Sequence, residues 1–216
     1  MFMQNVYFIS GLGADRRAFS FLDLSFCNPI FIDWLDALPK ETLEQYALRM
    51  YQQIPEKDPV IVGLSFGGML TTEMAKANPN IRGIIISSNK LPTEFPTLLK
   101  LGKILPVYKW TSGSFNKKFN QTFSWFLGVK GTEQRKIRQQ LIQDSDPVFT
   151  KWAIGAILHW QNKTAPTNIT HIHGTADKLL PYRYVKPDHT IEGGEHLMVM
   201  DKAGEISVLL KKLVVG

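Results

Sequence analysis

Cysteine is almost absent from this sequence, which has a single one, Cys27, among 216 residues. An intrachain disulfide is therefore excluded, and Cys and His do not cluster at the spacings that structural zinc sites use. Cys27 precedes a predicted strand and does not lie on a sharp turn beside a base, so a cysteine hydrolase is not favoured either. We expect its side chain to act as a small buried hydrophobic group.

Long apolar runs are also absent, and none approaches the roughly 18 residues that a membrane-spanning helix needs. The first residues lead into a strand-like segment without the basic start, apolar region and cleavage site of a secretion signal. These features predict a cytoplasmic protein with no membrane span. The chain is 44% hydrophobic, and its length suits one α/β domain that carries a substantial insertion.

The net charge of +6 is unevenly distributed along the chain. Residues 90–163 contain 12 Lys and Arg against 4 Asp and Glu, a net charge of +8, which leaves −2 for the remainder. No nucleic-acid-binding motif accompanies this bias, so we expect no nucleic-acid partner. A solvated basic face is the commoner meaning, while guidance of an anionic substrate such as an acyl-CoA thioester stays open. The residues that would provide such guidance are Lys117, Lys118, Arg135, Lys136 and Arg138.

The most informative stretch is a β-branched run at 60–62 that continues into Gly63-Leu64-Ser65-Phe66-Gly67 and then into a helical pattern. A GxSxG sequence in this context is typical of a nucleophile elbow, where a serine lies on a strained strand-to-helix turn. Side chains at the two glycine positions would collide with neighbouring backbone. The alternative is an ordinary glycine-rich turn, and the rest of the chain must distinguish the two.

Strand-like and helix-like segments alternate along the chain, apart from one long interruption. Strands are predicted at 6–9, 29–33, 60–62, 81–86, 169–174 and 189–192. Helices are predicted at 39–54, 132–143, 147–160 and 202–215, with another through Leu70, Met74 and Ala77 that ends near Asn78. This order predicts an α/β fold of three α/β/α layers with about six mainly parallel strands. Between 90 and 168 only short helical pieces appear. We therefore expect a core formed by residues 1–89 and 169–216, with a helical cap inserted at 90–168.

Functional residues of an open parallel sheet gather beyond the carboxyl ends of the strands. The loops there supply Ser65 after the third strand, Asp177 after the fifth, His196 after the sixth, and a glycine-rich turn at 10–13 after the first. Other residues could replace the acid or the base. The rival acids are Asp188, Glu192 and Glu195, and the weaker candidates for the base are His159, His171 and His173, the last more suited to bracing the Asp177 loop.

These motifs resemble those of the α/β-hydrolase superfamily, in a compact form with a helical cap, and the resemblance covers nearly the whole chain. GLSFGG resembles the family elbow, HGTADKLLP its acid loop and GGEH its histidine loop, while SGLGADRRAF occupies the position of its oxyanion loop. The resemblance implies that the backbone N–H groups of Leu12 and Phe66 form an oxyanion hole. One departure is Ser10, where many relatives have a histidine that supports the shape of the loop.

The resemblance implies a serine hydrolase that cleaves a small ester or thioester through an acyl-enzyme. Ser65 would attack, His196 would act as base and Asp177 would orient it, with no cofactor or metal. The same triad in a lyase, a C–C hydrolase or a perhydrolase is an alternative, as is a ligand-sensing protein without turnover. An apolar acyl group is expected from the aromatic residues of the cap, which are Phe115, Phe119, Phe123, Trp125, Phe126, Trp152 and Trp160.

Overall fold

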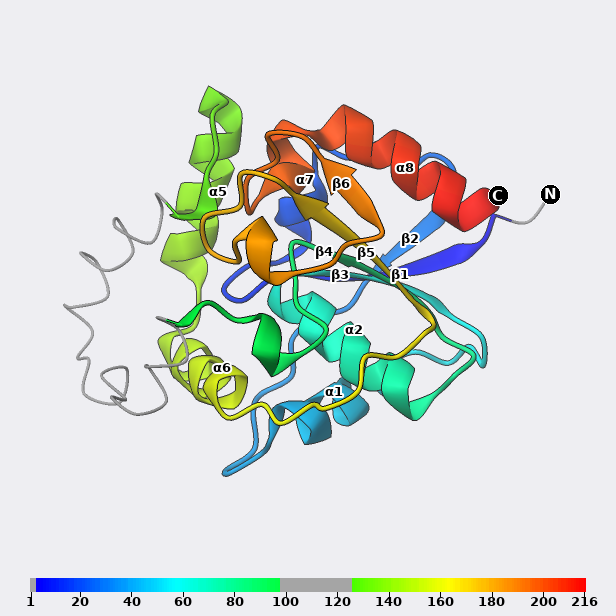
Figure 1. The fold of residues 1–216 in the computed structure, drawn as a ribbon, viewed down its shortest axis with the longest axis vertical. Helices are drawn as coiled ribbons and strands as arrows, with labels where there is room; N and C mark the ends of the chain where they lie inside the picture. Colours follow the sequence, from blue (N-terminus) through cyan, green and yellow to red (C-terminus); the bar gives the residue numbers. More distant parts are fainter. Residues whose placement is uncertain (1–2, 98–125) are drawn as a thin grey trace.

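The computed structural model of the protein describes residues 3–97 and 126–216. Six strands form one sheet in the order β2-β1-β3-β4-β5-β6, and every neighbouring pair is parallel (Figure 1). The strands are β1 (Asn5–Ile9), β2 (Asn28–Phe31), β3 (Val60–Leu64), β4 (Arg82–Ile86), β5 (Ile169–Gly174) and β6 (His189–Ile191). The predicted parallel α/β sheet is therefore confirmed.

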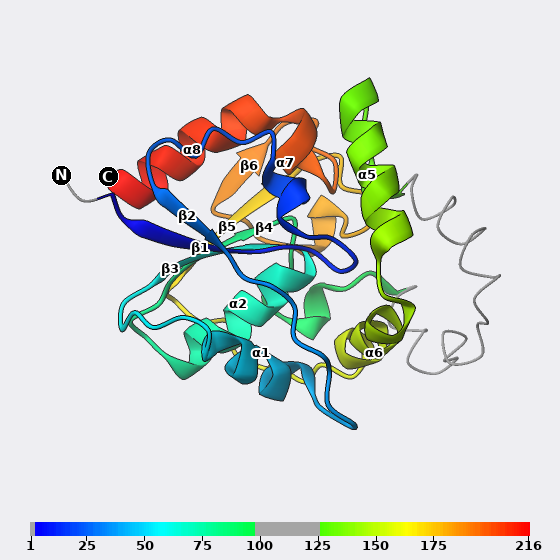
Figure 2. The same cartoon turned by 180° about the vertical axis from the view of Figure 1, so that it is seen from behind.

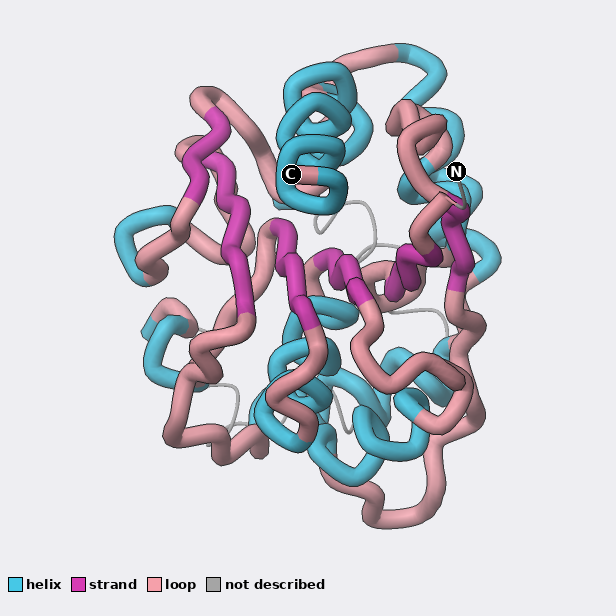
Figure 3. Tube along the Cα trace, turned by 90° about the vertical axis from the view of Figure 1, so that its right-hand side faces the viewer, coloured by secondary structure: helices cyan, strands magenta, loops and turns pink. Residues whose placement is uncertain are grey.

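Helices cover both faces of the sheet. One face carries α1 (Leu43–Tyr51) and α2 (Phe66–Ala77), and the other carries α7 (Met198–Asp201) and α8 (Ala203–Val215), as Figures 1 and 2 show. The view along the sheet in Figure 3 shows the strands as a middle layer between the two sets of helices. The predicted three-layer α/β/α arrangement is confirmed.

Successive side chains of a strand point to opposite faces of the sheet, so each strand contributes to two separate hydrophobic cores. In β1, Val6 and Phe8 pack with the residues of α8, while Tyr7 and Ile9 pack with those of α1 and α2. All five residues of β3 are buried. Burial on both faces explains why the central strands appear in the sequence as continuous apolar runs and not as an alternating pattern.

In the described part of the chain between β4 and β5 lie the α-helices α5 and α6. α5 (Thr132–Asp144) contributes Leu141 to the core on the α8 side, and α6 (Pro147–Leu158) contributes Phe149 to the core on the α1 and α2 side. Among the described residues of this segment there is no strand. The predicted basic residues Lys117 and Lys118 lie outside the described part of the chain, as do the aromatic residues Phe115, Phe119, Phe123 and Trp125.

The boundaries of the elements differ slightly from those predicted. The helix expected at 39–54 begins at Leu43, because the Thr42 hydroxyl accepts from the Gln45 backbone while the Gln45 side chain accepts from the Thr42 N–H, a capping box. α7 was not predicted and precedes α8. Cys27 is buried, and burial raises the pKa of its thiol to about 11, so the prediction of a small hydrophobic group is confirmed. No helix within 3–97 or 126–216 is long and apolar enough to cross a bilayer.

Candidate active site

Ser65 lies on the turn between β3 and α2 with φ 52° and ψ −113°, a conformation that a residue other than glycine rarely adopts. Two hydrogen bonds, one to the last residue of β4 and one from the segment just after it, hold the turn. The Ser65 N–H donates to the Ile86 carbonyl at 2.9 Å, and the Ser88 hydroxyl donates to the Ser65 carbonyl at 2.7 Å. Strain of this kind persists where the surrounding structure fixes it, and it occurs often at functional sites.

The two glycines of the elbow are required by close packing. A Cβ added to Gly67 would overlap the carbonyl oxygens of Ile9 and Ser10 at the end of β1, and one added to Gly63 would overlap the Gly67 carbonyl. The turn is therefore closed against the neighbouring strand by backbone contact, as expected from the sequence.

His196, after β6, lies against Ser65. Its Nε2 atom is 2.9 Å from Ser65 Oγ and its Nδ1 atom is 2.8 Å from Asp177 Oδ2, while only 1% of the residue is exposed. A carboxylate can only accept, so Nδ1 carries the proton and donates to Asp177. Nε2 then has a lone pair directed at the Ser65 hydroxyl. The structure thus brings together the three residues that the sequence suggested.

Asp177 has both carboxylate oxygens occupied. Oδ1 accepts from the N–H groups of Leu179 and Leu180 at 2.9 and 2.8 Å, and Oδ2 accepts from His196. Burial acts to raise the pKa of Asp177, but the nearby His196, the hydrogen bond from it, the nearby His173 and the Leu180 N–H together outweigh burial and lower that pKa. Asp177 is therefore a buried carboxylate that stays ionised.

The three rival acids are engaged elsewhere. Asp188 accepts from the His171 N–H at 2.7 Å, and Glu192 accepts from the Thr175 hydroxyl at 3.1 Å. Glu195 forms an ion pair with Lys178 at 3.3 Å. Asp177 is the carboxylate within hydrogen-bond distance of His196 in the described structure.

The other candidate histidines are not next to Ser65. His159 is exposed at the end of α6, and its Nδ1 bonds to the Gly155 carbonyl at 2.8 Å. His171 and His173 are buried on β5 and bond to each other at 3.0 Å. Burial lowers the pKa of both rings, that of His171 to about 2.

His173 connects this pair to the acid loop. Its Nε2 bonds to the Leu180 carbonyl at 2.8 Å and lies 3.5 Å from Asp177 Oδ2. The sequence analysis suggested bracing by His173 but missed His171 as its partner. The available signal was the spacing of two, which directs both rings to one face of a strand.

The turn after β1 carries the first of the two expected oxyanion donors. The Ala14 N–H donates to the Gly11 carbonyl at 3.0 Å, and Gly13 has φ 70°, as in a type II turn with Leu12 at its second position. A Cβ on Gly11 would lie 3.4 Å from the Ser65 Cβ, so this turn passes directly beside the serine.

The second expected donor, Phe66, is the first residue of α2, where a backbone N–H has no partner within its own helix. Within the described ranges, neither the Leu12 N–H nor the Phe66 N–H donates to another group.

The departure at Ser10 is compensated by local hydrogen bonds. The Ser10 hydroxyl donates to the Ala14 carbonyl at 2.7 Å, and Trp34 Nε1 donates to the same oxygen at 2.7 Å. The loop therefore has its own two braces in place of a histidine. Sequence reasoning missed Trp34, whose only signal was a bulky residue just after a strand.

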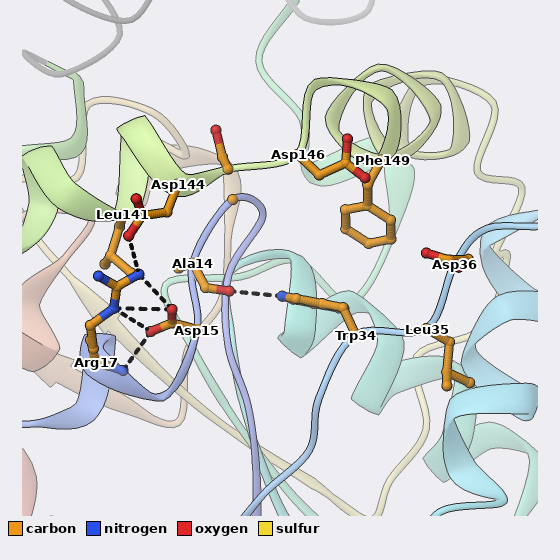
Figure 4. A pocket seen from close by; sticks show the side chains of 12 residues that line it. Ala14, Asp15, Arg17, Trp34, Leu35, Asp36, Leu141, Asp144, Asp146 and Phe149 are labelled. Atoms are coloured by element: carbon orange, nitrogen blue, oxygen red, sulfur yellow. Dashed lines mark hydrogen bonds and ion pairs between the residues drawn. The ribbon is translucent and has the colours of Figure 1, made fainter.

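A cavity of about 210 Å³ lies beside this loop, between it and the α5–α6 turn (Figure 4). Trp34 and Phe149 form its aromatic wall, and Arg17 bridges Asp15 and Asp144 at 2.7 and 2.8 Å. No three His, Cys, Asp or Glu side chains in the described part of the chain are grouped so that they could hold a metal ion.

Comparison with known proteins gives one family and many similar folds. A model described as "Alpha/beta hydrolase family" matches residues 6–208, whereas no curated protein matches the sequence. An esterase from Exiguobacterium antarcticum superposes with a TM-score of 0.73 at 13% identity, covering 100% of this chain and 93% of its own.

Two other solved structures are similar to the same extent. A bromoperoxidase from Bacillus anthracis has a TM-score of 0.70 at 16% identity, with 99% of this chain and 92% of its own covered. An N-acyl homoserine lactonase complexed with N-hexanoyl homoserine has a TM-score of 0.70 at 15% identity, with 98% and 88% covered. At these identities the likeness shows the fold.

Proposed function

Because the chain belongs to the alpha/beta hydrolase family, we propose that it is a serine hydrolase that cleaves a small carboxylic ester or thioester through an acyl-enzyme. The observation that carries this proposal is the hydrogen-bonded chain from Ser65 through His196 to the buried Asp177 carboxylate. The esterases and the lactonase among the similar folds support an ester of a small molecule as substrate.

The proposed reaction begins with a proton transfer. As Ser65 Oγ attacks the carbonyl carbon, its proton passes to His196 Nε2, and the imidazolium that forms is stabilised by the ionised Asp177. The carbonyl oxygen becomes an oxyanion that faces the N–H groups of Leu12 and Phe66. Removal of one such donor typically costs on the order of 10² to 10³ in rate.

The remaining steps use the same groups. Collapse of the tetrahedral intermediate expels the alkoxide or thiolate, which takes the proton from His196 and leaves the acyl group on Ser65. His196 then removes a proton from water as it attacks the acyl carbon, and the second collapse releases the carboxylic acid and restores the serine. No cofactor takes part in these steps.

We assign substrate selection to a cap formed by residues 90–168. The helices α5 and α6 lie within it, and Phe149 of α6, in the wall of the cavity, supports an apolar acyl or alcohol group. Guidance of an anionic substrate by the basic residues of this cap is a further part of the proposal, and Arg135, whose Nε donates to the Val129 carbonyl at 3.1 Å, keeps its full positive charge in that bond.

The test is Ser65→Ala, assayed by labelling with a fluorophosphonate probe and by hydrolysis of p-nitrophenyl acetate, longer p-nitrophenyl esters and acyl thioesters. We expect labelling to disappear and kcat to fall by at least about 10⁴-fold, with little change in Tm, since only a hydroxyl is removed. The matched control is Ser20→Ala, an exposed serine outside the site.

Labelling of the Ser65→Ala protein at the wild-type rate would contradict the assignment of the nucleophile. Labelling of Ser65 without turnover of any of these esters would instead favour the ligand-sensing alternative.

A further inference from the structure

Trp34 is a half-buried side chain on the segment that follows β2, and it contacts both halves of the proposed oxyanion hole. Its indole N–H donates to the Ala14 carbonyl at 2.7 Å, at the end of the turn that carries Leu12. Its ring stacks on that of Phe66, with centroids 5.7 Å apart and planes inclined by 30°. Figure 4 shows the bond from Trp34 to Ala14, two of the residues that line the cavity.

The bond to Ala14 fixes the turn at a defined point. The Ala14 carbonyl accepts from Trp34 on one side and from the Ser10 hydroxyl on the other, both at 2.7 Å. Because the Ala14 N–H also closes the turn onto Gly11, a shift of Ala14 moves the intervening Leu12 amide. The position of the Leu12 N–H therefore depends on what holds Ala14.

The stacking contact of Trp34 involves Phe66, whose N–H is the second donor of the proposed oxyanion hole. Phe66 is buried, and its ring contacts both Trp34 and Phe149 of the cap helix α6, while Phe149 also contacts Trp34 with centroids 5.2 Å apart. Trp34 thus contacts the turn that carries the Leu12 N–H, the ring of Phe66, and the cap.

We propose that Trp34 is a positioning residue for the oxyanion hole, setting the spacing between the Leu12 and Phe66 N–H groups through its indole N–H and its ring. The inference rests on the proposed hydrolase function. Such a residue does not touch the reacting atoms. Its effect is confined to the charge that develops in the transition state, so it acts on kcat and not on ground-state binding.

The test is Trp34→Phe, which keeps an aromatic ring and removes the N–H. We expect kcat for p-nitrophenyl acetate to fall about tenfold while KM changes by less than about twofold, since small displacements of positioned donors are costly. Amide hydrogen exchange in the peptide containing Leu12 should become faster. A benzothienylalanine at position 34, which has the shape of indole without the N–H, should reproduce both effects if Trp34→Phe folds poorly.

Ser10→Ala provides the partner variant, because it removes the other donor to the same carbonyl. If both residues act by holding Ala14, the fall in kcat of the double variant with Trp34→Phe should differ from the product of the falls in the two single variants. Tyr51→Phe is the matched control. Its hydroxyl accepts from the Asn78 side chain at 2.8 Å, away from the turn, so Tm should fall while kcat is retained.

Three outcomes would overturn the inference. One is an unchanged kcat with unchanged exchange at Leu12 in Trp34→Phe. Another is a rise in KM as large as the fall in kcat, which would make Trp34 a wall of the substrate cavity. The third is an equal fall in kcat in Tyr51→Phe, which would indicate general loss of packing. Absence of Ser65-dependent turnover in the wild-type protein would contradict the proposed function instead, and hydrogen exchange would still test the bond to Ala14.

Discussion

The elbow and the acid loop lie at the same end of the sheet, but different forces hold them. The elbow around Ser65 is closed by backbone contact, since a Cβ at Gly67 would overlap two carbonyl oxygens at the end of β1. The acid loop also begins at a close backbone contact, since a Cβ at Gly174 would overlap the Gly194 carbonyl oxygen. Beyond Gly174, however, it is held mainly by hydrogen bonds, two of which run from backbone N–H groups to Asp177. Backbone packing at Gly67 leaves no space for a side chain. In the acid loop, by contrast, one hydrogen bond can be removed while the others remain.

The histidine pair extends the hydrogen bonds of the acid loop into the sheet. The Leu180 carbonyl can only accept, so His173 carries its proton on Nε2 and uses Nδ1 as an acceptor. His171 Nε2–H must then be the donor to His173 at 3.0 Å. A run of donors from β5 therefore supports the backbone next to Asp177, each link in a fixed direction.

The largest effect is expected where the contact is steric. Gly67→Val should yield insoluble protein or lower the free energy of unfolding by more than about 4 kcal/mol, because a β-branched side chain would enter the backbone of β1. Soluble expression and urea unfolding provide the measurement. The matched control is Gly204→Val, where an added Cβ meets nothing within 4 Å. A soluble, active Gly67→Val protein would show that backbone contact does not define the elbow.

A smaller effect is expected in the hydrogen-bonded region. Asp177→Asn should fold and lower kcat by about 10² to 10⁴, since the amide no longer stabilises the imidazolium, and His196→Gln should be more severe because the base itself is lost. Steady-state hydrolysis of p-nitrophenyl acetate measures both. Glu195→Gln, in the loop before His196, is the control and should retain activity. If Glu195→Gln lost activity while Asp177→Asn kept it, Glu195 in the loop after β6 would be the acid of the triad.

The same contrast explains what the sequence could predict. The strands, their parallel pairing and the elbow follow from the hydrophobic period and from glycines that close contact requires, and these leave a pattern in the residues. The supports of the two loops depend on side chains from distant elements, such as Trp34 on Ala14 and His171 behind His173. Many residue types can form such a hydrogen bond, so no local sequence motif predicts it. The start of α1 at Leu43 differs from the prediction for a related reason, because a single capping box decides it.

The smallest expected effect is on the pH dependence of the free energy of unfolding, and it arises from the buried histidine pair. Burial lowers the pKa of His171 from 6.5 to about 2, so between these values the unfolded chain binds a proton that the folded chain does not. Stability is complete above about pH 6.5 and falls as the pH decreases, by about 1 kcal/mol for His171 between pH 7 and pH 5.5. The lowered pKa of Asp177 acts in the same direction, but only nearer its ordinary value of 3.8.

Urea unfolding at pH 7 and pH 5.5 measures this difference directly. His171→Leu should lower stability at pH 7, since the bond to His173 is lost, yet reduce the difference between the two pH values by about 1 kcal/mol. His159→Asn, which changes an exposed ring on α6, should keep the wild-type difference. If His171→Leu retained the full pH dependence, the proton uptake would have to belong to other groups, and the acid loop would not depend on a neutral imidazole behind it.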